Sequence, residues 1–104
     1  MENFHAFCSE LGGYANEMIV NYGKENHLRL TGLHETAHID DYSYGVSDRG
    51  SSIRIPHVVA SNGGRGYLED RRPAANMNPY KAIASLVKCT TLAESKITRG
   101  VSVE

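Results

Sequence analysis

Several residue types are scarce in this chain, and each scarcity excludes a class of protein. The 104 residues contain no tryptophan and only two cysteines, Cys8 and Cys89, which stand far apart and form no metal-ligand spacing. The formal net charge is −1, so the charge balance predicts no nucleic acid and no membrane surface as a partner. No secretory segment follows Met1 and no long apolar run occurs, so we expect a reduced, cytoplasmic setting.

What the chain does contain is a dense cluster of opposite charges in residues 66–73 (GYLEDRRP). On a strand, alternate side chains share a face, so Glu69 and Arg71 project together. Asp70 and Arg72 project the opposite way. A carboxylate beside a guanidinium suits a metal-bound phosphate, because the carboxylate holds a hard cation and the arginine fork binds phosphoryl oxygens. The alternative is a surface ion pair, which contributes little.

A second run, around residues 51–55, alternates apolar and polar side chains, which predicts a half-buried strand. The glycine-rich loop that follows tolerates positive φ, so this strand is expected to pair antiparallel with a strand around 66–71. Such a hairpin gathers Arg54, Glu69 and Arg71 on one surface if its register allows it. The sequence leaves that register open.

The remaining pattern predicts an α+β fold in which antiparallel strands are flanked by an N-terminal and a C-terminal helix. Apolar residues at spacings of three and four predict an amphipathic helix over about 2–22, weakened by Gly12 and Gly13. A further extended segment is expected around 28–31. Residues 32–45 show no clear period and are expected to form a loop.

A C-terminal helix is expected to open at Asn78 and Pro79, because proline suits the first helical turn. Apolar side chains recur from Tyr80 onward at helical spacing. From residue 93 to 104 the chain is polar and is expected to fray.

Four runs of this sequence, in this order and spacing, resemble the type II glutamine synthetases, in the C-terminal part of their catalytic domain. The runs are 28–36 (LRLTGLHET), 41–46 (DYSYGV), 48–56 (DRGSSIRIP) and 66–80, which contains GYLEDRRPAAN and NPY. The resemblance implies a partial glutamine synthetase catalytic domain over 1–92, followed by a polar tail over 93–104.

The resemblance also implies an activity. Glutamine synthetases are ligases of glutamine biosynthesis and nitrogen assimilation: they phosphorylate the γ-carboxylate of glutamate from ATP, and ammonia then displaces phosphate from the γ-glutamyl phosphate. The implied cofactors are ATP and Mg²⁺ or Mn²⁺. The implied partners are glutamate, ammonia and ATP as substrates, and a homo-oligomer or a complementing glutamine synthetase subunit.

By position in the matched runs, the resemblance assigns catalytic roles to Glu35, Arg49 and Arg71. Glu35 lies in the flap that closes over glutamate and helps to form the ammonium site. Arg49 contacts both the substrate and ATP, and Arg71 contacts the transferred phosphoryl group.

Three further residues receive binding roles from the same resemblance. Arg29 matches an arginine that holds glutamate, Arg54 matches one that binds nucleotide phosphate, and Glu69 matches a metal ligand. Without the family pattern, a solvent-facing residue of an edge strand is the favoured interpretation of Arg29.

Departures from the family pattern leave two other functions open. Asp48 precedes Arg49 where the family usually has asparagine, and the family's other metal ligands and glutamate loop are absent from these residues. The isolated chain is therefore expected to be inactive, with half of the active site missing. The alternatives are a non-catalytic remnant that binds nucleotide or an intact subunit, and a fragment of a γ-glutamyl-amine ligase.

Overall fold

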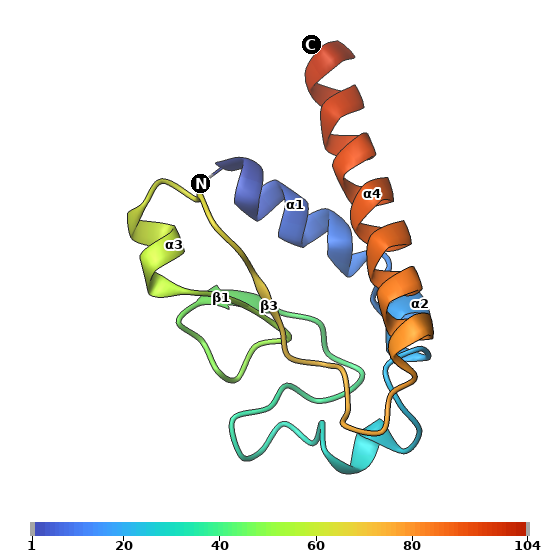
Figure 1. The fold of residues 1–104 in the computed structure, drawn as a ribbon. Helices are drawn as coiled ribbons and strands as arrows, with labels where there is room; N and C mark the ends of the chain where they lie inside the picture. Colours follow the sequence, from blue (N-terminus) through green and yellow to red (C-terminus); the bar gives the residue numbers. More distant parts are fainter. Residues whose placement is uncertain (1, 104) are drawn as a thin grey trace.

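The computed structural model describes the backbone of residues 2–103 and the side chains of residues 5–97. Helices and a small sheet are both present, as the α+β expectation requires (Figure 1). The elements, in chain order, are α1 (Glu2–Gly12), α2 (Ala15–Ile19), a 3₁₀ helix (Asn26–Leu28), β1 (Tyr44–Val46), β2 (Ile53–Ile55), α3 (His57–Ser61), β3 (Glu69–Asp70) and α4 (Pro79–Val103). Both α1 and α2 pack against α4, and the sheet lies beside them.

The expected N-terminal helix is present but is split into α1 and α2 at the glycine pair. Gly12 lies directly against the ring of Tyr42, and a Cβ at this position would come within 2.8 Å of that ring. The glycine therefore both weakens the helix and permits the close approach of the loop that carries Tyr42.

The predicted pairing of the strands around 51–55 and 66–71 is confirmed, and its register is now defined. β2 pairs antiparallel with β3, with Arg54 opposite Glu69 and Ile53 opposite Asp70. The expectation of purely antiparallel strands was wrong, because β1 pairs with β2 in parallel and lies partly inside the segment expected to be a loop.

Parallel neighbours usually need a long crossover, but the strands here have only three residues each. An extended chain advances about 3.3 Å per residue, so residues 47–52 are long enough to return along a strand of three residues and begin the next strand in parallel. Asp48 shapes this connection: its Oδ1 accepts from Gly50 N at 2.8 Å, and its carbonyl accepts from Ser51 Oγ at 2.7 Å.

The strand expected around 28–31 does not form, and this prediction was wrong. Leu28 is instead the last residue of the 3₁₀ helix, and side-chain hydrogen bonds from Asn26 and Arg29 join this part of the chain to the segment after β3. The buried Asn26 donates from Nδ2 to the carbonyl of Arg72 at 2.6 Å. Leu30 is buried, while Leu28 is exposed.

α4 begins at Pro79 as predicted, and Asn78 Oδ1 accepts a hydrogen bond from Tyr80 N at 3.0 Å. The helix continues to Val103, past the position where a polar tail was expected to start. As a domain boundary, the division between 1–92 and 93–104 stays a prediction. Small side chains line the buried face of α4, which permits close packing: Ala82, Ser85, Cys89 and Ala93.

The core lies between α1, α2, α4 and the inner face of the sheet. Its buried members are Cys8, Leu11, Met18, Tyr22, Ile53, Ile55, Val59, Ala82, Cys89 and Ala93. Within the described residues, no helix combines the length and the hydropathy that a membrane crossing requires.

Candidate functional site

Arg54 and Glu69 face each other across the β2–β3 pair. Arg54 Nη1 donates to Glu69 Oε2 at 3.0 Å, and both side chains are partly buried. The buried Nε of Arg54 has no hydrogen-bond partner among the described residues. The hairpin thus brings together the predicted phosphate ligand and the predicted metal ligand, as the alternation of side chains implied.

Three segments converge beside this pair and bring together the residues predicted to be catalytic. Arg71 Nη2 donates to the backbone carbonyl of Glu35 at 3.2 Å. The Glu35 carboxylate lies 3.7 Å from Arg49 Nη1, and each of these two side chains is 64% exposed. Glu35, Arg49 and Arg71 are called the outer cluster below. Their catalytic roles stay predictions.

The loop that carries Glu35 has an unusual backbone. His34 and Glu35 have φ values of 54° and 60°, in the left-handed region that non-glycine residues rarely occupy. Such residues cost on the order of 1 to 3 kcal/mol each and persist only where neighbouring contacts hold them. Here Ile39 N donates to the Leu30 carbonyl at 2.9 Å and closes the loop.

The guanidinium of Arg29 is engaged by the backbone. Its Nη2 donates to the carbonyls of Arg71, Arg72 and Pro73 at 3.1, 2.7 and 3.2 Å. Its Nε donates to Asn26 Oδ1 at 3.3 Å. Arg29 therefore ties its own segment to the chain that leaves β3, and its predicted contact with glutamate stays a prediction.

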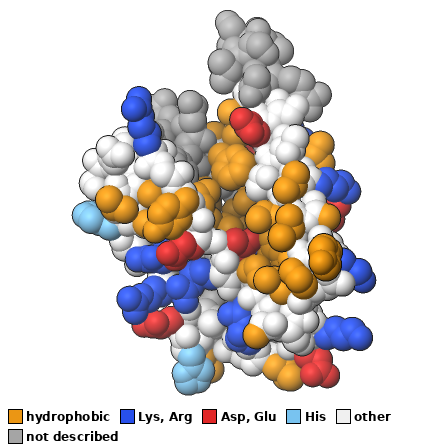
Figure 2. Space-filling view, in the orientation of Figure 1, with side chains coloured by type: hydrophobic (Ala, Val, Ile, Leu, Met, Phe, Trp, Pro, Cys, Tyr) orange, Lys and Arg blue, Asp and Glu red, His pale blue; other side chains and the backbone are white. Residues whose placement is uncertain are grey.

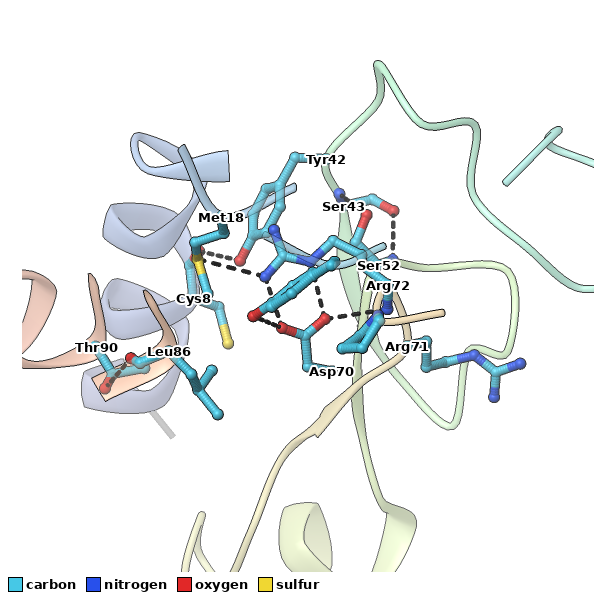
Figure 3. A network of polar contacts seen from close by, with 12 residues as sticks. Cys8, Met18, Tyr42, Ser43, Ser52, Asp70, Arg71, Arg72, Leu86 and Thr90 are labelled. Carbon is cyan, nitrogen blue, oxygen red and sulfur yellow. Dashed lines mark hydrogen bonds and ion pairs between the residues drawn. The ribbon is translucent and has the colours of Figure 1, made fainter. Parts of the chain in front are cut away.

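The inner face of β3 carries a buried ion pair that the sequence did not identify as part of a site (Figure 3). Arg72 is 4% exposed and binds Asp70 through two hydrogen bonds of 2.8 Å, from Nε and from Nη2. Its guanidinium carbon lies 5.3 Å from the centre of the Tyr22 ring and 5.4 Å from that of Tyr42. These four residues are called the inner network below.

Both tyrosine hydroxyls of the inner network donate hydrogen bonds. Tyr22 Oη donates to Asp70 Oδ2 at 2.7 Å, and Tyr42 Oη donates to the carbonyl of Cys8 at 2.6 Å. Burial and the Asp70 carboxylate raise the pKa of Tyr22 above its ordinary value. Burial lowers the pKa of Arg72, but the hydrogen-bonded Asp70 outweighs that effect and raises it, so the guanidinium stays charged.

One signal in the sequence does point to the inner network. The alternation along β3 places Asp70 opposite Ile53, a core residue, so the inward direction of Asp70 and Arg72 follows from the strand pattern. The inner network fixes the orientation of this segment. Figure 3 shows Arg71 pointing away from it.

The described residues do not form a complete metal site. No group of three or more His, Cys, Asp or Glu side chains among them is placed to hold a metal ion. The Glu69 carboxylate is already paired with Arg54. A divalent cation such as Mg²⁺ takes several oxygen ligands, so the Glu69 carboxylate alone does not complete its coordination.

Comparisons with known proteins support the resemblance drawn from the sequence. No family model matches the chain. The chain is 57% identical over 76 residues to the glutamine synthetase of Suillus bovinus, a match that covers 73% of this chain and 21% of that protein. It is 48% identical over 92 residues to the glutamine synthetase of Amanita muscaria, with 88% and 26% covered.

A bacterial protein shows the same similarity. The glutamine synthetase of Bradyrhizobium diazoefficiens is 46% identical over 87 residues, which cover 84% of this chain and 25% of that protein. Most of the chain is thus similar to a segment of a ligase, and the ligase is glutamine synthetase. The chain spans about a fifth to a quarter of the length of these relatives.

Proposed function

We propose that this chain forms part of the active site of an ATP-dependent glutamate–ammonia ligase, where it binds the transferred phosphoryl group and the nucleotide phosphates. One observation carries the proposal: the Arg54–Glu69 pair and the outer cluster present three arginines and two carboxylates from the hairpin and two adjoining loops. The identity to glutamine synthetases supports the choice of reaction.

The arrangement suits phosphoryl transfer, in which charge neutralisation and positioning dominate over covalent chemistry by the protein. Arg71 gives one hydrogen bond to a carbonyl, and its buried Nε has no partner within the described side chains. Arg49 is largely exposed. Both guanidinium groups therefore have donors available for phosphoryl oxygens or for the substrate carboxylate.

Glu35 acts on the second substrate in this proposal. Its exposed carboxylate attracts the ammonium ion and accepts the proton that ammonium loses before it attacks. When the Glu35 loop closes, it excludes water from an acyl phosphate that water otherwise hydrolyses. Retention of this carboxylate favours ammonia over a larger amine as the nucleophile.

The cation and glutamate need groups beyond these residues. Glu69 is one ligand of Mg²⁺ or Mn²⁺ in this proposal, and the other ligands come from outside the chain, as does most of the glutamate pocket. We therefore expect the 104 residues alone to bind nucleotide and not to catalyse. Nucleotide binding without turnover is also what a non-catalytic remnant does, and the lone metal ligand favours that second function.

Calorimetric titration of ADP with Mg²⁺ tests the phosphate site. Arg71→Ala is expected to weaken binding at least tenfold, because a charge-assisted hydrogen bond contributes about 1.5 to 3 kcal/mol. Arg65→Ala is the matched control, since Arg65 is an exposed arginine outside the outer cluster. Equal affinities of wild type and Arg71→Ala, or tighter binding of glutamate than of ADP, would overturn the proposal.

A turnover assay addresses the division between binding and catalysis. The purified chain, supplied with ATP, glutamate, ammonia and Mg²⁺ or Mn²⁺, is expected to stay at background. Turnover that Glu69→Ala abolishes would contradict the expectation that the chain needs further segments.

A further inference from the structure

The connection between α3 and β3 contains the pair Asn62-Gly63, and no other asparagine of the sequence is followed by glycine. Asn62 directly follows α3, and both residues of the pair are exposed. Figure 1 shows this loop at the edge of the molecule, on the side away from α4. In Figure 2 the same corner of the surface is open and mainly white, the colour of backbone and of uncharged polar side chains. Solvent therefore reaches both residues.

The end of α3 explains why glycines stand in this loop. Gly63 and Gly64 have φ values of 71° and 84°, in the left-handed region that glycine adopts without steric cost. Asn62 N donates to the carbonyl of Val59 at 3.2 Å, and Gly64 N donates to the same carbonyl at 2.9 Å. The pair thus first serves to stop a helix. Its chemistry is a second property.

Neither reacting group of the pair is held by a hydrogen bond. Within the part of the chain that the structure describes, Gly63 N and the side-chain amide of Asn62 have no hydrogen-bond partner. A Cβ at Gly63 would meet no atom within 4 Å, so the space beside this glycine is open. Asn62 has a ψ of 30°, and rotation about its Cα–C bond brings the Gly63 nitrogen toward the side-chain carbonyl carbon. The hydrogen bond from Gly64 to Val59 resists this rotation.

We propose that Asn62 is a site of spontaneous deamidation, with the backbone nitrogen of Gly63 as the nucleophile. This nitrogen gives its proton to a base in solution and attacks Cγ of Asn62. A bond forms between the two atoms, and the bond from Cγ to the side-chain nitrogen breaks. The side-chain nitrogen takes a proton from solvent and leaves as ammonia, so the product is a cyclic imide.

Water then opens the cyclic imide at one of its two carbonyl carbons. Attack at the side-chain carbonyl gives aspartate at position 62. Attack at the backbone carbonyl gives isoaspartate, in which the main chain runs through the former side chain and is longer by one methylene. Nothing is oxidised or reduced in either step, and each product adds one carboxylate to the chain. The reaction needs neither nucleotide nor metal, so the inference stands apart from the proposed function.

Other asparagines of the chain lack the features that favour this reaction. Asn26 is buried, and Asn76 donates from Nδ2 to a backbone carbonyl at 3.1 Å. Asn78 precedes Pro79, whose nitrogen carries no proton and cannot act as the nucleophile. A side chain on the residue after asparagine also hinders the approach of its nitrogen, and glycine has none. The structure and the sequence therefore favour Asn62.

Mass spectrometry of the aged full chain tests the proposal. The folded 104-residue chain is incubated in mildly alkaline buffer made with oxygen-18 water, which labels each new carboxylate, and is then digested with trypsin. Cleavage after Arg54 and Arg65 releases residues 55–65, in which Asn62 is the only asparagine. We expect labelled acid, as aspartate and isoaspartate, to form there at least about tenfold faster than at Asn76 or Asn78.

Gly63→Ala is expected to slow the reaction at least about tenfold, because its methyl group hinders the attacking nitrogen. Gly64→Ala is the matched control. It also places alanine at a positive φ, but it keeps the Asn62-Gly63 pair, and it is expected to react at least as fast as wild type. Because both variants carry similar backbone strain, a difference between them reports the chemistry of the pair. An unchanged rate in Gly63→Ala, or equal slowing in both variants, would overturn the proposal.

The products and the pH dependence identify the nucleophile. Attack by Gly63 N requires its deprotonated form, so the rate is expected to rise with pH, and the cyclic imide yields both acids. Direct hydrolysis of the side-chain amide by water yields aspartate without isoaspartate. Labelled aspartate alone would therefore refute the role of Gly63, as would labelled acid that forms at Asn76 as fast as at Asn62.

Discussion

The inner and outer faces of the charged run at β3 carry the same chemistry in different surroundings. On the inner face, Asp70 and Arg72 form two hydrogen bonds of 2.8 Å within the core. On the outer face, Glu69 binds Arg54 through one contact of 3.0 Å, and Arg71 donates to a backbone carbonyl rather than to a carboxylate among the described residues. The buried Asp70–Arg72 pair is thus part of the core, whereas the Arg54–Glu69 pair is more exposed to solvent.

The surroundings explain how the core accommodates the inner pair. Desolvation of two charges is costly, and it is offset only when geometry is good and further hydrogen bonds are made. Tyr22 supplies such a bond, and the faces of two tyrosine rings lie near the guanidinium. In the outer cluster, the side chains of Glu35 and Arg49 are exposed to solvent, so their charges interact weakly.

The largest expected effect comes from breaking the inner pair. Asp70→Ala leaves the Arg72 charge buried without a partner, and we expect the free energy of unfolding to fall by about 3 to 5 kcal/mol. Urea denaturation followed by circular dichroism measures this. Glu69→Ala is the control on the opposite face and is expected to cost about 1 kcal/mol or less. Similar losses in both variants would remove the distinction between the faces.

A titration in alkali gives the next largest effect. Burial raises the pKa of Cys8 from 9.0 to about 11. The unfolded chain loses this proton at a lower pH than the folded chain does. The contribution of the buried thiol to the free energy of unfolding is therefore fully present below about pH 9 and falls as pH rises toward about 11. The expected loss is about 2 to 3 kcal/mol at 1.4 kcal/mol per pH unit.

Denaturant midpoints between pH 8 and pH 11 check this slope, and Cys8→Ala is expected to reduce it. Tyr22 adds a further loss above about pH 10, since its pKa is also raised. Sensitivity to alkali is thus expected of the core that contains Cys8 and Tyr22. Identical pH profiles of wild type and Cys8→Ala would show that the thiol is not responsible.

A smaller effect is expected from one hydroxyl of the inner network. Tyr42→Phe removes the donor to the Cys8 carbonyl, and we expect a loss of about 0.5 to 1.5 kcal/mol. Tyr67→Phe serves as control, because Tyr67 is 61% exposed, and it is expected to change stability little. Denaturation of both variants in parallel decides whether the hydroxyl or the ring carries the contribution of Tyr42.

The features that sequence predicted are those set by local periodicity. Alternation in two short runs predicted the β2–β3 pair and which of its residues project together, and Asn78 with Pro79 marked the start of α4. The glycine pair predicted a weak point in one N-terminal helix, and the break between α1 and α2 lies there. Each of these depends on residues near one another in the chain.

The features that sequence missed depend on distant contacts. Tyr22 and Asp70 are 48 positions apart, and no period links Tyr42 to Arg72. The false strand at 28–31 has the same origin, because Asn26 and Arg29 bind the backbone after β3 rather than a neighbouring strand. β1 was missed because it is short and pairs in parallel with β2 after a short connection, an arrangement that no common sequence pattern predicts.

The smallest expected effect comes from the outer cluster. Arg49 and Glu35 are 3.7 Å apart and mostly exposed, so solvent and salt screen their attraction and the pair contributes little to folding. We expect Arg49→Gln to change the free energy of unfolding by less than about 0.5 kcal/mol. Denaturation in low and high salt measures it, while the same variant is expected to bind ADP more weakly. A stability loss comparable to that of Asp70→Ala, with ADP binding unchanged, would mean that Arg49 has a structural role. A side chain that binds a ligand is instead expected to affect ligand binding more than the free energy of unfolding.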